Sequence, residues 1–312
     1  MKKLLGIIVF LLILYGALLF ADPGARSAEN HYSLGERIGL YGILSLGAGL
    51  LIITGGLDLS LGSVVGLCAT SLAILLMDKN WPPLLAMLAV LAMGALIGLI
   101  NGLLVTRLRM QAFVVTLCGL FLYRGAARWV AGDQPKGLGT RFVELKQVLA
   151  GSFLGVPVPL WILLVLSGIT ILCLHFSVYG RYFYALGSNE QAARYSGIAT
   201  NRYRVLAYVI CSTLGAFFSI LLLMKYNTAT PSTTGEFYEL YAIAGAVLGG
   251  CSLRGGEGTV IGILIGTSIL WLLPNLANMW DVPNTLINTV IGGALLLGAI
   301  LDEVLRSRSE VR

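Results

Sequence analysis

Long apolar runs separated by short polar segments make up almost the whole sequence. A helix that crosses a membrane needs roughly 20 apolar residues, and about 17 can suffice. Ten runs approach this length: 4–20, 38–54, 61–77, 84–105, 112–131, 160–178, 205–223, 239–253, 259–273 and 284–301. The run at 239–253 would cover only about 22 Å, so a short span and a re-entrant half-helix both fit it. The pattern predicts an all-α polytopic membrane bundle of about ten transmembrane helices, in one domain over residues 1–312.

Composition supports a membrane location. Hydrophobic residues make up 57% of the 312 residues and charged residues only 12%, whereas about 25% of an ordinary soluble domain is charged. Lys2 and Lys3 followed by the apolar run 4–20 could be a signal peptide, but the run is long for one and further spans follow at once. We therefore expect a retained first helix. Five cysteines scattered through apolar runs indicate core residues instead of a disulfide or metal set.

The distribution of Lys and Arg sets the expected orientation. The formal net charge is +6, but the cations occupy short loops without forming a basic stripe, so membrane orientation explains them better than nucleic acid binding. Placing the N-terminus inside puts the densest cluster, around 181–204, and the charged C-terminal tail on the inner side. We expect a multi-pass protein of the cell inner membrane with both termini cytoplasmic. Its longest non-spanning pieces are 132–159 and 179–204.

Motifs of enzymes and ATPases are missing from the sequence. No GxxxxGK[ST] phosphate loop occurs, and neither do HExxH or GxSxG. The only histidines are His31 and His175, far apart. We expect no catalytic residue, no metal and no cofactor, which leaves a passive pathway or one part of a pump.

The stretch TGGLDLSLGS at 54–63 predicts a break between two helices. Gly55 and Gly56 permit backbone conformations that a β-carbon penalises. Asp58 can then accept hydrogen bonds from freed backbone N–H groups, and Ser60 can cap the next helix, ahead of Gly62. The alternative is that a carboxylate at membrane depth marks a substrate or ion pathway.

A second glycine-rich stretch, GGCSLRGGEG at 249–258, echoes the first. Both contain a glycine pair with Leu three residues after its second glycine, and both continue into Gly-[Ser/Thr]-Val-[Val/Ile]-Gly. Chance explains this echo as well as a repeat does. The expected topology puts both breaks on the inner side, as a parallel repeat would, whereas an inverted repeat would put one outside. The glycines of the second break are Gly249, Gly250, Gly255, Gly256 and Gly258.

The inner segment 179–204 contains a helix pattern over 188–197. Ser188 is a suitable N-cap, Gln191 follows in the capping-box position, and Gly197 can end the helix in a left-handed conformation. Thr200 would cap the next span. Small residues at 192 and 193 and the large Tyr195 suit a contact surface, while the alternative is a loop helix whose arginines meet the inner headgroups.

Polar residues inside the spans are candidates for the pathway. Arg124 and Arg128 are four residues apart and share a helix face, where they either reach the outer headgroups or line the outer mouth. The asparagines either hydrogen-bond a solute or join helices to one another. The candidate pathway residues are Asn101, Arg124, Asn275, Asn278 and Asn288.

These motifs resemble the integral-membrane permease subunits of ribose-type ATP-binding-cassette importers. TGGLDLSLGS is similar to the family signature GGIDLSVGS, and further pieces match in order over roughly 38–301. They are Asn101-Gly102, the runs 113–117, 123–125 and 185–198, Tyr238-Glu239-Leu240, and LGGCSLRGGEGTVIG at 248–262.

The resemblance implies an importer with two permease subunits, two cytoplasmic ATPases and an external sugar-binding protein. It also implies the ten-helix vitamin-type importer fold, ATP hydrolysis on the separate subunits, and a ribose-type monosaccharide as solute. Gln191-Ala192-Ala193-x-x-x-Gly197 resembles the Glu-Ala-Ala-x-x-x-Gly motif by which such permeases engage their ATPases. The expected coupling residues are Ser188, Glu190, Gln191, Ala192, Ala193, Arg194, Tyr195 and Gly197.

Two other functions stay open at this point. One is import of branched-chain amino acids, nucleosides or a signalling sugar by a related permease. The other is an ion-coupled carrier working alone, which has no need of the segment 179–204. The sequence does not decide between a homodimer and a pair of sister permeases.

Overall fold

The computed structural model describes residues 2–21, 23–289, 291–293 and 296. Its helices are α1 Lys2–Ala21, α2 Ala28–Ile53, α3 Leu61–Met77, α4 Pro83–Thr106, α5 Ala112–Ala131, α6 Val143–Ala150, α7 Val158–His175, α8 Val178–Ser188, α9 Glu190–Tyr195, α10 Thr200–Tyr226, α11 Tyr238–Leu248 and α12 Val260–Met279, with 3-10 turns η1 Pro23–Arg26 and η2 Asn284–Leu286. Two short antiparallel pairs join β1 Lys136–Gly137 to β4 Thr228–Ala229 and β2 Ser152–Phe153 to β3 Val156–Pro157.

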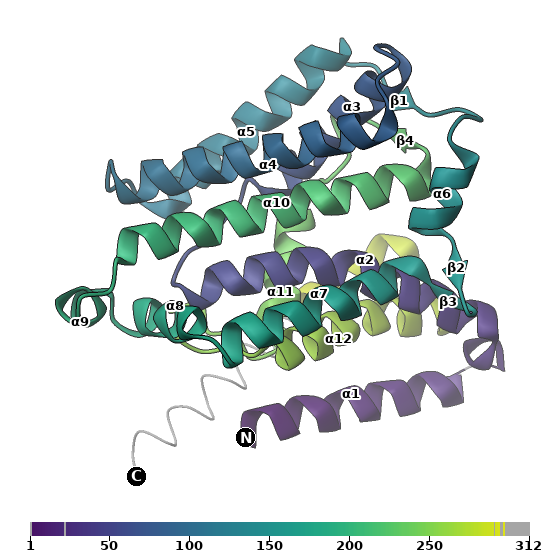
Figure 1. Ribbon diagram of the computed structural model, residues 1–312. Coiled ribbons are helices and arrows are strands. Elements are labelled where there is room, and N and C mark those ends of the chain that lie inside the picture. The colour runs from purple at the N-terminus through teal and green to yellow at the C-terminus, as the bar shows by residue number, and fades with distance from the viewer. Residues whose placement is uncertain (1, 22, 290, 294–295, 297–312) are drawn as a thin grey trace.

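The long helices lie side by side in one bundle (Figure 1). Helices α2 and α10 run through its middle, α4 and α5 cover one side, and α1 lies on the opposite side beside α12. The short helices α8 and α9 lie at one end of the bundle, which we call the α9 end. The other end carries α6 and the two strand pairs, and we call it the α6 end.

Burial differs strongly between the central and the outer helices. The most apolar stretch of α2 is 89% buried, whereas the corresponding stretches of α4, α5 and α7 are only 28%, 28% and 22% buried. Apolar side chains that face outward on a helix need an apolar surrounding. This distribution fits a bundle whose outer helices face lipid around a packed centre.

The helices support the predicted membrane bundle. Six described helices are long and apolar enough to cross a membrane by length and composition, namely α2, α4, α5, α7, α10 and α12. Shorter apolar helices cover 4–20, 61–77 and 238–248. Of the predicted run at 284–301, residues 284–289, 291–293 and 296 are described, and the rest lies outside the described residues.

Two spans, α2 and α10, begin well before the residue that the hydropathy pattern predicts, whereas the others start within two residues of it. Helix α2 starts at Ala28 instead of 38, because its polar first turns find partners: Glu36 forms a 2.6 Å ion pair with Lys225, and Asn30 and Asn275 exchange amide hydrogen bonds of 2.7 and 3.3 Å. Helix α10 starts at 200 instead of 205. Pairing across helices thus extends them beyond their apolar runs.

Helix α11 is a half-helix. Its 11 residues cover only about 16 Å at 1.5 Å per residue, which is too short for a membrane crossing. The segment before it enters the bundle, because a Cβ added at Gly235 would lie 2.1 Å from the Gly62 carbonyl oxygen. The ring of Tyr238 packs edge-on against Tyr41 of α2. Of the two expectations for 239–253, the half-helix is the one that fits.

Candidate functional site: two helix breaks and the α8–α9 segment

The first break, residues 54–60 between α2 and α3, contains a directed chain of buried hydrogen bonds. The Tyr123 hydroxyl donates to Asn101 Oδ1 at 2.8 Å, the Asn101 amide donates to Ser60 Oγ at 3.1 Å, and the Ser60 hydroxyl donates to Asp58 Oδ1 at 2.5 Å. All four side chains are less than 10% exposed. The chain therefore ties the break to α4 and α5 by side chains alone.

Asp58 also accepts a 2.8 Å hydrogen bond from the Ser60 backbone N–H, as the sequence predicts. The predicted cap at Ser60 is wrong. Ser60 precedes α3 in a helical conformation and its hydroxyl makes no capping bond, because Asp58 and Asn101 engage it. Tyr208 of α10 donates to the Leu57 carbonyl oxygen at 3.0 Å and fixes the same turn from the other side.

The second break, 249–258, is held by close backbone approach. A Cβ added at Gly249 would lie 2.2 Å from the Gly262 carbonyl oxygen, so the start of α12 packs directly on the end of α11. Gly250, Gly255, Gly256 and Gly258 all have positive φ angles, between 75° and 149°. Such a run of left-handed backbone is accessible to glycine and strained for other residues.

The two breaks touch each other at the α9 end. The Gly256 N–H donates to the Ile53 carbonyl oxygen at 2.8 Å, and a Cβ added at Gly255 would meet Gly55 Cα at 2.8 Å. Both breaks therefore lie at one end of the bundle, as the parallel arrangement predicts.

The helices of the α8–α9 segment differ from the predicted helix at 188–197. Ser188 is the last residue of α8, and Asn189 caps α9 by accepting a 3.0 Å hydrogen bond from the Ala192 N–H. Gln191 is consequently not in a capping-box position. Asparagine is as good an N-cap as serine, which explains the one-residue error.

The ends of the segment were predicted with mixed success. Gly197 follows α9 with φ +84°, which confirms the left-handed termination. Thr200 is the first residue of α10, and the helix begins without a side-chain cap, so the predicted cap at Thr200 is wrong.

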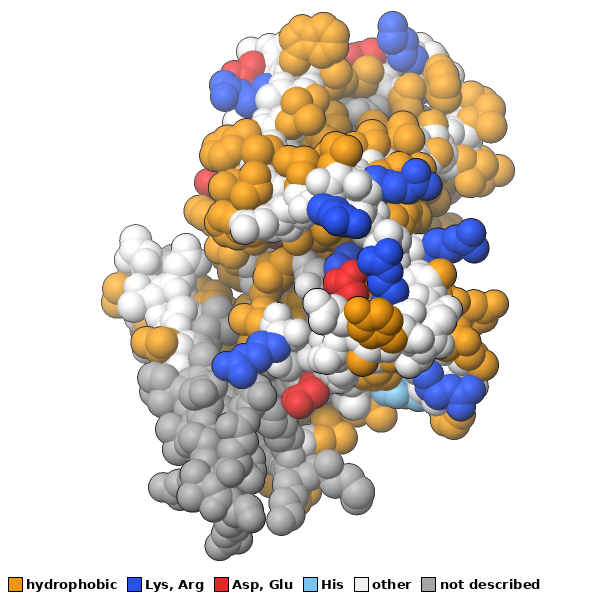
Figure 2. Space-filling model, turned by 90° about the vertical axis from the view of Figure 1, so that its left-hand side faces the viewer, with side chains coloured by type: hydrophobic (Ala, Val, Ile, Leu, Met, Phe, Trp, Pro, Cys, Tyr) orange, Lys and Arg blue, Asp and Glu red, His pale blue; other side chains and the backbone are white. Residues whose placement is uncertain are grey.

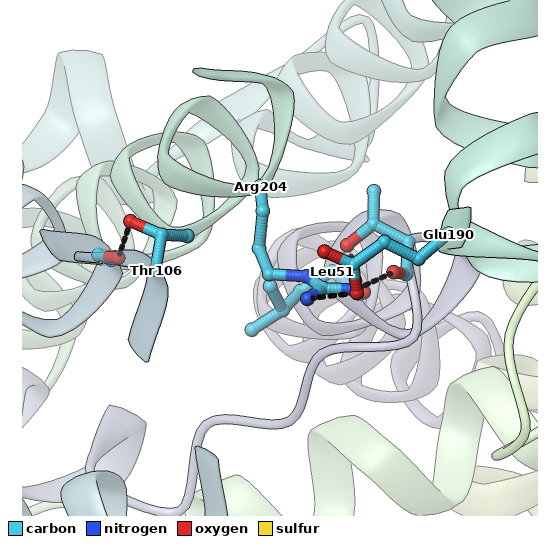
Figure 3. A network of polar contacts seen from close by, with 6 residues as sticks. Leu51, Thr106, Glu190 and Arg204 are labelled. Atoms are coloured by element: carbon cyan, nitrogen blue, oxygen red, sulfur yellow. Dashed lines mark hydrogen bonds and ion pairs between the residues drawn. The ribbon is translucent and has the colours of Figure 1, made fainter. Parts of the chain in front are cut away.

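Arg204 links α9 to the first break. Its guanidinium donates to Glu190 Oε2 at 2.7 Å and to the Thr54 carbonyl oxygen at 3.5 Å. Figure 3 shows Arg204 and Glu190 pointing toward each other beside the end of α2 at Leu51. Sequence reasoning did not single out Arg204, because its partner stands 14 positions earlier in another helix.

The end of α8 packs on both breaks. A Cβ added at Gly187 would overlap the Ile53 carbonyl oxygen and the Gly256 nitrogen, and the Tyr184 hydroxyl donates to the Gly258 carbonyl oxygen at 2.7 Å. Within α9, Ala193 is buried whereas Tyr195 is 90% exposed, as are the side chains at 191, 192 and 194 to a lesser degree. The segment thus presents one face to the breaks and a large aromatic side chain outward.

The five candidate pathway residues do not come together. Asn101 belongs to the chain in the first break, and Asn275 pairs with Asn30 between α2 and α12. Asn278 is exposed near the end of α12, and Asn288 accepts a 3.3 Å hydrogen bond from Tyr241. The remaining residue is Arg124 of α5.

Arg124 and Arg128 have different partners although they share a helix. Arg124 donates to the carbonyl oxygens of Pro231 and Thr234, in the segment that leads into α11. Arg128 forms a 2.7 Å ion pair with Asp133 at the α6 end, and its guanidinium lowers the pKa of that carboxyl. Arg124 therefore stabilises the half-helix segment, while Arg128 stays at the surface.

Figure 2 shows the face of the molecule that contains the α9 end, with Lys and Arg side chains across its middle and hydrophobic side chains above and below. The exposed arginines of the α4–α5 turn, of α9 and of the first turn of α10 are Arg107, Arg109, Arg194 and Arg202. Cations outnumber carboxylates here, as they do on the inner side of many membrane proteins.

Comparisons with known proteins agree on the class of the chain. The family described as "branched-chain amino acid transport system / permease component" matches residues 35–300. The ribose import permease protein RbsC of Escherichia coli K12 is 35% identical over 95% of this chain and 92% of its own length. Its counterpart in Bacillus subtilis 168 is also 35% identical, over 94% and 90%.

The autoinducer 2 import system permease protein LsrC of an Enterobacter species (strain 638) is 39% identical over 95% of this chain and 85% of its own length. No solved structure matches the chain.

Proposed function

The chain belongs to the permease-component family of branched-chain amino acid transport systems, and from that premise we propose that it forms the transmembrane pathway of an ATP-binding-cassette importer for a sugar. The observation that carries the proposal is the similarity of 35–39% over nearly the whole chain to permeases named for ribose and autoinducer 2. As a permease the chain is a transport component and not an enzyme. ATP hydrolysis then falls to a separate subunit.

The partners follow from this assignment. We propose that a second permease, two cytoplasmic ATPase subunits and an external solute-binding protein complete the importer. The solute is a monosaccharide of the ribose type. The single domain 1–312 would contain about ten membrane-inserted helices in the vitamin-type importer arrangement, with both termini cytoplasmic and the α9 end facing the cytoplasm.

Helix α9 is the proposed contact for the ATPase. Its six residues are too few for a stable helix in water, so the packing of Ala193 and the ion pair between Glu190 and Arg204 must hold it in place. Tyr195 projects from it, and exposed tyrosines are enriched at protein interfaces. These features supply a rigid, outward-facing anchor.

Side-chain and backbone contacts connect α9 and α8 to the two helix breaks, so a movement of α9 can be transmitted to them. Arg204 connects Glu190 of α9 to the Thr54 carbonyl of the first break, and Gly187 of α8 contacts the backbone of both breaks. A displacement of the segment 178–195 would therefore tilt α2 and α12 together, since α8 contacts the end of α2 and the break that leads into α12. This is how we propose that closure of the ATPases opens the pathway.

Autoinducer 2 transport is the second candidate, because the LsrC relative is 39% identical over 95% of the chain. The stand-alone carrier is not favoured, since the relatives named above are permeases of import systems. Import of branched-chain amino acids or nucleosides is favoured by no residue of the described site.

Reconstitution in proteoliposomes with the ATPase and the binding protein tests the proposed function. We expect ATP-dependent uptake of labelled ribose or autoinducer 2, and no uptake of leucine. If leucine were taken up and neither ribose nor autoinducer 2 were, the sugar assignment would be contradicted. Robust ATP hydrolysis by the chain alone would contradict its role as an importer subunit.

The coupling role is tested by Tyr195→Ala. Because the Tyr195 side chain is exposed, its removal should leave the fold intact while retention of the ATPase during purification falls about tenfold or more. The matched control is Tyr226→Ala, which removes a 53% exposed tyrosine at the α6 end and should retain the ATPase fully. Normal uptake by Tyr195→Ala with the ATPase still bound would contradict the assignment of α9.

A further inference from the structure

A pocket of about 460 Å³ lies at the α9 end, next to the ion pair between Glu190 and Arg204. It is bounded by α9, the first turns of α10 and the turn between α4 and α5. Each of these three elements contributes one arginine to the lining: Arg194, Arg204 and Arg109. Backbone of the first break, at Gly55 and Gly56, forms part of the wall.

The pocket carries a positive charge that the described residues do not neutralise. Glu190 is the one carboxylate among the described lining residues, and it is paired with Arg204 at 2.7 Å. Within the described ranges, the side chains of Arg109 and Arg194 have neither an ion pair nor a hydrogen bond. Two guanidinium groups from different elements of the pocket lining are therefore available to a ligand.

Orientation in the membrane does not require arginines to converge on a pocket. Arg107 and Arg202 stand beside Arg109 and Arg204 in sequence and lie on the surface, outside the lining. They add to the inner charge as much as the lining arginines do. Arg109 and Arg194 instead line one pocket together with the amides of Asn201 and Gln111, and such a set of donors can recognise an oxyanion.

We propose that this pocket binds a phosphate group. A guanidinium offers paired N–H donors that match phosphate oxygens. Two guanidinium groups with amide donors nearby suit a tetrahedral phosphate, which has more acceptor oxygens than a carboxylate ligand. The group comes either from free phosphate or a phosphate ester in the aqueous phase, or from the headgroup of an anionic lipid, which basic pockets at helix ends bind. The cytoplasmic placement of the pocket and the regulatory role of the bound anion rest on the proposed function, whereas the binding itself does not.

The location gives the bound anion a regulatory role. A phosphate between Arg109 and Arg194 would join the α4–α5 turn to α9, the element that the proposed ATPase contact must move. Occupancy would therefore restrain α9, and an empty pocket would release it.

Binding to the purified full chain tests the proposal without any transport measurement. In nanodiscs of phosphatidylcholine, the chain is titrated with radiolabelled inorganic phosphate. In a second arm, phosphatidylglycerol is added to the discs and the lipid retained on the chain is measured by native mass spectrometry. We expect saturable binding in at least one arm, weakened about tenfold or more by Arg109→Gln and again by Arg194→Gln.

The matched control is Arg107→Gln, which removes the same charge two residues away from Arg109 but outside the pocket. It should bind as the unmodified chain does, and melting temperatures identify any variant that fails to fold. If Arg109→Gln weakens phosphate binding in the first arm, the site takes a soluble anion. If it weakens lipid retention in the second arm, the site takes a lipid headgroup. Equal behaviour of Arg109→Gln and Arg107→Gln in both arms would overturn the phosphate site, and leaves the permease function untouched.

Discussion

Each of the two helix breaks holds a turn between successive helices, but the two turns are fixed by different kinds of contact. The break at 54–60 is fixed by side chains, in the hydrogen-bond chain from Tyr123 through Asn101 and Ser60 to Asp58. The break at 249–258 is fixed by backbone contacts, in which glycines of α11 and α12 approach to distances that no side chain allows.

Similar glycine motifs can therefore be sensitive to different kinds of substitution. The second break depends on the space that an absent Cβ leaves, so it responds to added volume. The first break depends on satisfied polar atoms in a buried site, so it responds to the loss of a hydrogen-bonding group. Four substitutions separate the two kinds of dependence.

Gly249→Ala should have the largest effect. Gly249 has φ −75°, which any residue adopts, so the substitution adds no backbone strain. Its new methyl would lie 2.2 Å from the Gly262 carbonyl oxygen, and backbone on both sides prevents relief. Overpacking of this kind costs about 1–3 kcal/mol or more. We expect little folded protein in fluorescence-detected size exclusion, whereas Gly168→Ala, with open space around its position in α7, should match the unmodified chain.

Asp58→Ala should have the next largest effect. It leaves the Ser60 N–H and hydroxyl without their acceptor in a buried site, at a cost of about 1–3 kcal/mol. Asp58→Asn keeps an acceptor oxygen and should lose much less folded protein, with transport per folded molecule preserved. Normal abundance of Asp58→Asn with no transport would make Asp58 a pathway residue instead of a structural one.

Gly55→Ala tests the effect of backbone strain without any steric overlap of the added methyl group. The nearest atom to the added methyl is 3.8 Å away, but φ is +77°. A left-handed alanine costs about 1–2 kcal/mol. The melting temperature of the purified chain should therefore fall less than it does for Gly249→Ala. An equal fall for both would show that the two breaks are not fixed in different ways.

Tyr123→Phe should have the smallest effect. It removes only the hydroxyl of Tyr123, the first donor of the chain, at a cost of about 1 kcal/mol. Combined with Asp58→Ala it should be less damaging than the sum of the two single changes, because the chain is already interrupted. Strict additivity of the two melting-temperature shifts would indicate that the four side chains do not act as a unit.

The sequence predicts where apolar helices lie better than where they start. The runs 4–20, 61–77 and 112–131 agree with α1, α3 and α5 within two residues. The start of α2 could not be predicted, because Glu36 pairs with Lys225 of α10, a contact that hydropathy along one segment cannot contain.

The candidate site was predictable in its glycines and not in its partners. Positive φ angles at Gly55 and Gly197 follow from local chemistry, since these positions end helices. The pairing of Asn101 with Ser60 and Tyr123, and of Arg204 with Glu190, depends on which helices are neighbours. An amide inside an apolar helix indicates only that a partner exists.

The amide pair between Asn30 and Asn275 bears on the order of events during biosynthesis. The two residues are 245 positions apart in the chain, so at about 5–20 residues per second the ribosome needs roughly 12–49 s to make the second after the first. Through that interval the Asn30 side chain, close to the beginning of α2, has its local hydrogen bond to the Ala25 carbonyl oxygen but lacks the exchange with Asn275. Its Arg37 neighbour likewise lacks the Trp271 ring on which it later stacks. Arrival of α12 supplies both partners at once, so this part of α2 completes its polar pairing only after α12 has been made.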